Sequence, residues 1–138
     1  MTTVTITEEI DGAANAVWTA LSDFGGIKVG GPITSFETEG TGVGMVRTIG
    51  MGGGQVIERL DRHDAEAMVF SYAIINDDCP LPVSDYSATV QITDKGDGTC
   101  RVDWTGTFEP KGSETEAVGI VEGIYRGGIA RARKAVGG

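Results

Sequence analysis

Three polar side chains lie on otherwise apolar faces of predicted strands, where they could bind a polar group or transfer a proton. Successive side chains of a strand alternate between two faces, so each polar residue points the same way as its apolar neighbours. Burying a charge without a partner is costly. The arginine and the glutamate therefore either pair with each other or converge on a ligand that brings its own polar atoms. The residues are Arg47 with Ile49 and Met51, Glu58 with Val56 and Leu60, and Tyr86 with Ala88, Val90 and Ile92.

Two further aromatic residues lie in predicted strands. Trp104 shares its face with Val102, Gly106 and Phe108, so we expect it to point inward. Residues 68–76 are apolar on both faces, so the pattern alone does not orient Tyr72.

The segment from Ser113 to Val136 is predicted to be one long helix with two stripes. Ser113 and Glu116 have the spacing of a capping box. One stripe has the spacing of a buried helical face: Ala117, Ile120, Val121, Ile124 and Gly128. The other consists of Gly119, Gly123 and Gly127. Each glycine costs about 1 kcal/mol relative to alanine in a helix, so either a neighbour approaches closely or the helix leaves space for a ligand.

These side chains are positioned by a predicted order of strand, helix, six strands and long helix. Short turns between the strands indicate antiparallel neighbours. The expected fold class is therefore α+β, with a curved antiparallel sheet and a pocket between the sheet and the last helix. The expected strands are 2–11, 33–39, 45–49, 55–61, 68–76, 85–93 and 99–109, and the expected helices are 13–24 and 113–136.

Composition excludes several classes of protein. With 138 residues, 40% of them hydrophobic, the chain is expected to form one globular domain over residues 1–138. A net charge of −9 argues against nucleic acid and anionic membranes as partners. No apolar run approaches the ~18 residues of a membrane span, and no secretory signal is recognised, so a cytoplasmic location is expected. The basic cluster Arg126, Arg131, Arg133 and Lys134 is expected to complement the dipole of the last helix.

Other motifs do not indicate chemistry. Cys79 and Cys100 are isolated and His63 is the only histidine, so neither a zinc site nor a catalytic triad is expected. His63 lies in a charged segment, 61–64, that is predicted to be a solvated turn. The glycine-rich segments 40–44 and 50–54 lack a phosphate-binding signature and are predicted to be hairpin turns.

The order of elements, read with specific residues, resembles the START-like helix-grip superfamily, often called SRPBCC. This superfamily includes the birch pollen allergen, plant abscisic acid receptors and small bacterial polyketide cyclase/dehydrase-like proteins, and the resemblance covers nearly the whole chain. It implies a helix-grip fold, in which a seven-stranded curved sheet wraps around the C-terminal helix. The segments that carry it are Ala16–Phe24, Val56–Leu60, Asp85–Tyr86 and the last helix.

The resemblance to the abscisic acid receptors also implies positions for a ligand. The receptors' pocket lysine, glutamate and tyrosine fall on Lys28, Glu58 and Tyr86, and their next-strand aromatic falls on Tyr72, beside Ile74. The helical residues that touch ligand fall on Ile120, Ile124 and Gly128. The same comparison places Asp103 inward, whereas apolar alternation places Trp104 inward. The receptors' gate and latch loops are replaced by Gly50–Gly54 and Cys79–Pro82, so only the layout of the pocket transfers.

The sequence leaves two functions open. The first is a carrier for a small, largely apolar ligand. Such a ligand would be aromatic, polyketide-like or lipid-like and would carry a carboxylate, phenol or carbonyl group. Its body would contact Ile74, Trp104, Ile120 and Ile124, and its polar end Lys28, Arg47, Glu58 and Tyr86. The second is a cofactor-independent cyclase, dehydratase or aldol-type enzyme, with Lys28, Glu58 and Tyr86 as catalytic groups. Neither needs a cofactor or a metal. The protein is expected to be a monomer or a homodimer.

Overall fold

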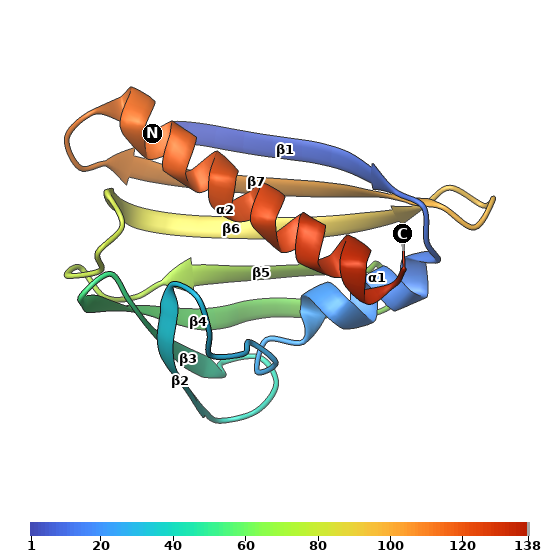
Figure 1. Ribbon diagram of the computed structural model, residues 1–138, viewed down its shortest axis with the longest axis horizontal. Coiled ribbons are helices and arrows are strands. Elements are labelled where there is room, and N and C mark those ends of the chain that lie inside the picture. The colour runs from blue at the N-terminus through green and yellow to red at the C-terminus, as the bar shows by residue number, and fades with distance from the viewer. Residues whose placement is uncertain (138) are drawn as a thin grey trace.

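The computed structural model describes residues 1–137 and consists of one antiparallel sheet and two helices (Figure 1). The seven strands lie in the order β1-β7-β6-β5-β4-β3-β2. Their bounds are β1 Thr2–Ile10, β2 Ile33–Glu39, β3 Val46–Met51, β4 Gly54–Asp64, β5 Val69–Ile74, β6 Val83–Asp94 and β7 Cys100–Pro110, and the helices are α1 Ala14–Ser22 and α2 Glu114–Ala135. The curved sheet with a long C-terminal helix confirms the predicted helix-grip fold.

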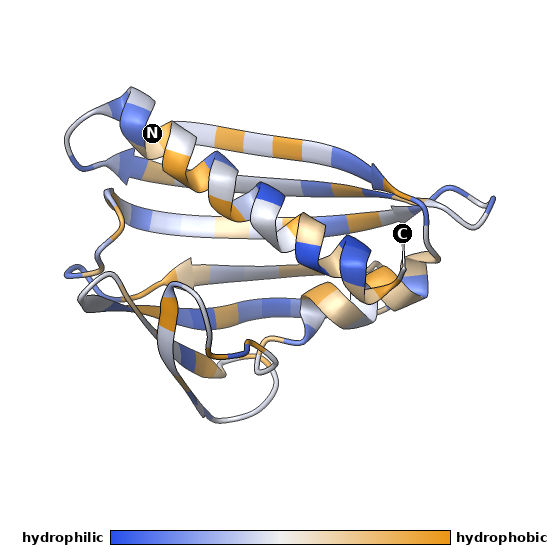
Figure 2. Ribbon diagram, viewed as in Figure 1, coloured by the Kyte–Doolittle hydropathy of each residue, from blue (hydrophilic) through white to orange (hydrophobic). Residues whose placement is uncertain are grey.

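Helix α2 crosses the sheet diagonally, packing on β1 and β7, and its C-terminal end contacts α1 (Figure 1). Hydropathy alternates along the strands, and α2 carries apolar residues along part of its circumference (Figure 2). Side chains from the sheet and from α2 meet in one core, in which Val90, Val102, Phe108 and Ile129 have no exposed surface. Neither helix of residues 1–137 has the length and apolar composition that a transmembrane span requires.

Short turns set the strand register, as predicted. Gly52 and Gly53 join β3 to β4 with φ angles of 57° and 77°. Two successive residues in this left-handed region make a tight hairpin loop that glycine forms without strain. Arg47 then pairs with Glu58 across the two strands, so their side chains share one face of the sheet.

Strand β4 is longer than the sequence suggests. Residues 61–64 were expected to form a charged turn, but β4 continues through Asp64, and the turn lies at residues 65–68. A register shift follows Leu60, and His63 then pairs with Phe70 of β5. The charged residues of this segment stay exposed or half-exposed, and a strand tolerates them where it has a solvated face.

Helix α2 begins as predicted and buries three of the five residues predicted for its buried stripe, Ala117, Val121 and Gly128. The Ser113 side chain accepts a hydrogen bond from the backbone N–H of Glu116 at 3.2 Å, which confirms the helix start. Ile120 and Ile124, expected on the buried face, are 37% and 39% exposed, so this expectation is wrong. The buried face is rotated away from them and consists of Ala117, Val121, Tyr125, Gly128, Ile129 and Ala132.

Candidate ligand-binding site

An open cavity of about 590 Å³ lies between the sheet, α1, the segment after α1 and the C-terminal half of α2. Its apolar walls include Leu21, Ile27, Phe70, Trp104 and Ala132. Cavities of 300–1,000 Å³ with apolar walls and a few polar groups are typical of small-molecule sites. The polar and charged side chains around this cavity are those of Asp23, Lys28, Arg47, Tyr72 and Arg131.

A second hollow, of about 690 Å³, lies between α1 and the loop that joins β2 to β3. Trp18, Leu60 and His63 line it, and the Trp18 and His63 rings lie 5.1 Å apart. The residues predicted to form the site do not line this hollow, so the first cavity is the candidate site.

Arg47 is held in the wall of the cavity by three contacts. Its Nε and Nη2 atoms each lie 2.7 Å from Oε1 of Glu58. Its Nη1 donates to the Phe24 carbonyl at 3.1 Å, and its guanidinium carbon lies 3.8 Å from the centre of the Phe24 ring. The Arg47 and Glu58 side chains are only 13% and 10% exposed. Of the two alternatives left by the sequence, the structure therefore shows the ion pair.

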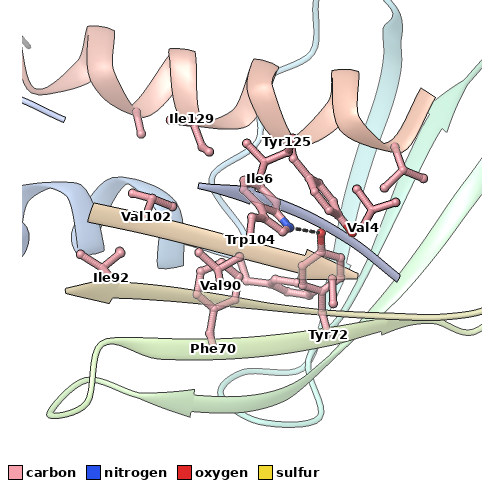
Figure 3. Close-up of a cluster of buried hydrophobic side chains, with 14 of the residues drawn as sticks. Val4, Ile6, Phe70, Tyr72, Val90, Ile92, Val102, Trp104, Tyr125 and Ile129 are labelled. Atoms are coloured by element: carbon pink, nitrogen blue, oxygen red, sulfur yellow. Dashed lines mark hydrogen bonds between the residues drawn. The ribbon is translucent and has the colours of Figure 1, made fainter. Parts of the chain in front are cut away.

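Three buried tyrosine hydroxyls form a chain that ends at the cavity. The Tyr125 hydroxyl bonds that of Tyr86, and the Tyr86 oxygen lies 3.5 Å from that of Tyr72. Trp104 Nε1 donates to the Tyr72 hydroxyl at 3.2 Å (Figure 3). Trp104 also stacks on Tyr125, with ring centres 4.9 Å apart. The chain joins β5, β6 and β7 to α2, and Tyr72 is its member that lines the cavity.

The number of hydroxyl hydrogens leaves one of them outside this chain of hydrogen bonds. Two hydrogen bonds among three hydroxyls use two of the three hydrogens and leave one. Either oxygen can be the donor in both hydrogen bonds. Buried donors need an acceptor, and Tyr72 is the member of the chain that lines the cavity, so an acceptor in the cavity would favour the arrangement from Tyr125 to Tyr86 to Tyr72. In this arrangement the Tyr72 oxygen accepts from Trp104 and Tyr86, and its hydrogen is available to an acceptor in the cavity.

The hydroxyls of this chain remain protonated at neutral pH. Burial raises the pKa of Tyr72, Tyr86 and Tyr125 well above the usual value, and the charge of Glu58 adds to the effect on Tyr72. A neutral tyrosine donates a hydrogen bond but does not act as a base. The part of the cavity that Tyr72 lines therefore suits a hydrogen-bond acceptor such as a carbonyl or carboxylate oxygen.

The structure separates the predicted site residues into three groups. Lys28, Arg47, Tyr72, Trp104 and Gly128 line the cavity. Glu58 and Tyr86 lie behind this lining, bonded to Arg47 and to Tyr72. Ile74, Ile120 and Ile124 do not line the cavity, although Ile124 lies one turn before Gly128 on the same side of α2. A role in ligand binding stays a prediction for all of them.

Gly128 allows Trp104 to pack against α2. A β-carbon at position 128 would lie 2.7 Å and 2.8 Å from two atoms of the indole ring. Close approach therefore explains this glycine. In contrast, a β-carbon at Gly119 or Gly123 would meet nothing within 4 Å, so packing does not explain the second glycine row.

Tyr125 and Arg131 were not predicted from the sequence, and neither were lining residues such as Leu21, Ile27 and Phe70. Tyr125 lies four and eight residues after Val121 and Ala117, and continuing that stripe would have found it. Arg131 was assigned to a basic cluster at the end of the helix. The structure divides that cluster, because Arg126 and Arg133 contact Glu8 of β1 at 3.8 Å and 3.0 Å, whereas Arg131 lines the cavity.

Together these features define a helix-grip protein with a cavity between its sheet and its C-terminal helix. The chain belongs to the family described as polyketide cyclase/dehydrase and lipid transport, whose model matches residues 1–137. This match confirms the resemblance to the START-like superfamily.

Several solved structures share the fold. An uncharacterised protein from Bacillus thuringiensis is 30% identical, with a TM-score of 0.82 and 98% of each chain covered. The protein XoxI from Bacillus cereus is also 30% identical, with a TM-score of 0.83 and coverage of 99% of this chain and 96% of that one. Norcoclaurine synthase from Thalictrum flavum, solved with dopamine and hydroxybenzaldehyde, is 20% identical, with a TM-score of 0.72. The match covers 96% of this chain and 83% of that one. A comparison with curated proteins found no match.

Proposed function

We propose that this protein binds a small, largely apolar molecule, aromatic, polyketide- or lipid-like, in the cavity between the sheet and α2. The observation that carries the proposal is the cavity of about 590 Å³, whose walls are largely apolar and include Tyr72. Burying apolar surface contributes about 25 cal/mol per Å², which is enough for micromolar binding of a small molecule that fits this cavity. A carbonyl, carboxylate or phenol oxygen on the ligand would accept the free hydrogen of Tyr72.

Native mass spectrometry of the purified protein, followed by organic extraction, tests the proposal directly. A bound apolar molecule in a one-to-one ratio would support it and would identify a chemical class. If the protein is empty, titration with the neutral fluorescent probe N-phenyl-1-naphthylamine tests the same cavity. An empty protein that also fails to bind this probe would contradict the proposal.

A pair of variants locates the probe. Ile27 lines the cavity and packs against the core, whereas Val29, two residues later, is 60% exposed and lies outside the lining. Ile27→Trp fills part of the cavity and should weaken probe binding roughly tenfold, about 1.4 kcal/mol. Val29→Trp adds the same ring outside the cavity and should leave binding unchanged. Equal effects of the two variants would place the probe elsewhere.

The alternative is an enzyme of the cyclase, dehydratase or aldol type that uses the same cavity. The hydroxyl chain favours it, because Tyr72 could donate to an oxygen that gains negative charge during the reaction. Tyr86 would then act through Tyr72, and Lys28 at the cavity mouth would polarise or deprotonate the substrate. The Glu58 carboxylate is bonded to Arg47, and this ion pair favours the carrier over an acid–base role for Glu58.

Lys28→Ala and Glu58→Gln separate the two functions. In an enzyme that acts on phenolic or β-dicarbonyl compounds, either change should abolish turnover while binding of N-phenyl-1-naphthylamine persists. In a carrier, the same changes should weaken only ligands that carry a matching polar group. Absence of any effect on turnover or on ligand binding would show that these residues do not belong to the site.

A further inference from the structure

The mouth of the cavity carries two basic side chains that have no acidic partner. Lys28, in the segment after α1, and Arg131, on α2, both line the cavity and are exposed. Within residues 1–137, neither takes part in an ion pair. Asp23 is the single carboxylate among the lining residues, and the charge of the third basic residue, Arg47, is balanced by Glu58.

This local charge is opposite to that of the molecule as a whole. The chain has a formal net charge of −9, so a small anion is repelled by the protein overall. The two unpaired cations outnumber the one carboxylate of the lining, Asp23, so the formal charge of the opening is positive. A charged opening concentrates ligands of the opposite charge and orients them as they enter.

The position of Arg131 on α2 sets it apart from the other arginines of the helix. It lies three residues after Gly128 and four before Ala135, and all three line the cavity. A β-carbon built on Gly127 would lie 3.7 Å from Nη1 of Arg131, so the guanidinium extends back along the helix beside this glycine. Arg126 and Arg133 instead extend toward Glu8 of β1.

We propose that Arg131 and Lys28 together bind the anionic group of the ligand at the cavity mouth. This inference rests on the proposed function and adds the ligand class to it. The ligand is an amphipathic acid whose carboxylate, sulfonate or phosphate group lies at the mouth. Its apolar body fills the cavity, and the oxygen that accepts from Tyr72 is a separate carbonyl or phenol group on that body. An arginine fork and a lysine ammonium both form charge-assisted hydrogen bonds to such oxygens.

Two probes with the same aromatic body provide the test. 8-Anilinonaphthalene-1-sulfonate carries a sulfonate, and N-phenyl-1-naphthylamine is the same molecule without it. The wild-type protein should bind the sulfonate more tightly, and this preference should fall as salt is added. Arg131→Gln and Lys28→Gln should each weaken sulfonate binding about fivefold, as expected for partly exposed charged contacts, and change the neutral probe by less than twofold.

Arg126→Gln is the matched control, because it removes the same charge from the same helix outside the cavity. It should leave the binding of both probes unchanged, and circular dichroism should show that all variants remain folded. If Arg131→Gln affects the sulfonate no more than Arg126→Gln does, or weakens both probes equally, the anion site is refuted while cavity binding stands. If the wild-type protein binds neither probe, both the anion site and the proposed function are refuted.

Discussion

The three tyrosines of this chain all lie in one buried hydroxyl chain, so their ionisation reports on the fold. Burial raises the pKa of each above its usual value of about 10. The folded state therefore holds these protons more tightly than the unfolded state does. Below pH 10 both states are protonated and stability is unaffected; above pH 10 the unfolded state releases protons and stability falls.

This difference predicts a cooperative alkaline transition. Tyrosinate absorbance near 295 nm should be absent from the folded protein at pH 10 and should rise only together with loss of the circular dichroism signal. The free energy of unfolding should fall by ~4 kcal/mol per pH unit above pH 10 if the three tyrosines ionise on unfolding. A tyrosine that titrates near pH 10 while the protein stays folded would contradict the buried chain.

The ion pair between Arg47 and Glu58 makes a second prediction for single residues. Arg47→Met leaves the Glu58 carboxylate largely buried without its partner, so we expect a loss of about 3 kcal/mol of stability. The double variant Arg47→Met/Glu58→Leu removes both charges and should recover more than half of that loss. Urea denaturation of the single and double variants measures both values. An equal loss in both variants would show that side-chain packing matters more than the charge.

At the scale of single elements, the glycines of α2 predict opposite effects of one substitution. Gly123 has open space around it, so Gly123→Ala should stabilise the protein by about 1 kcal/mol through helix propensity alone. Gly128→Ala places a methyl group against the Trp104 ring, which Tyr125 and Tyr72 hold in place. We expect a loss of roughly 1–3 kcal/mol from overpacking. Thermal denaturation of both variants tests this, and a gain in both would mean that Trp104 moves freely.

Alternation along strands was a reliable guide to the sheet. It placed Trp104, Tyr86 and Val90 inward, and all three are buried. It favoured Trp104 over Asp103, and the Asp103 side chain is 29% exposed, bonded to Thr7 of β1. These positions follow because side chains in a strand have only two directions.

Helical periodicity was less decisive. Apolar residues of α2 include Ile120 and Ile124 as well as Tyr125 and Ile129, so the spacing fits more than one arc. Packing against β1 and β7 selects the arc that contains Tyr125 and Ile129. Sequence spacing also does not determine where the side chains at the cavity mouth point. Lys28 lies in a glycine-rich segment without regular periodicity, and the direction of Arg131 depends on which way the helix is rotated. The directions of the Lys28 and Arg131 side chains therefore cannot be predicted from the spacing of residues along the sequence.

At the scale of the whole molecule, the strands at the two ends of the strand order differ in how far their side chains are buried. Strands β1, β6 and β7 form paired neighbours beneath α2, and several of their residues have no exposed surface. Strand β2 is an edge strand whose residues are exposed or half-exposed. Segments with few buried contacts open at lower free energy than the core does. The cavity opens beside this less protected side, where residues 26–33 provide part of its lining.

This asymmetry predicts where a ligand changes the dynamics. Saturating N-phenyl-1-naphthylamine should slow amide hydrogen exchange most in residues 26–33 and 128–135, which line the cavity from opposite sides. The turn at residues 95–98, which does not line the cavity, should exchange at the same rate with and without the probe. Hydrogen-exchange mass spectrometry distinguishes the two hollows, because binding in the second one would instead protect residues 38–45 and 60–63. Protection there, with residues 26–33 unchanged, would move the site to the Trp18 side of α1 and exclude Lys28 and Arg131 from it.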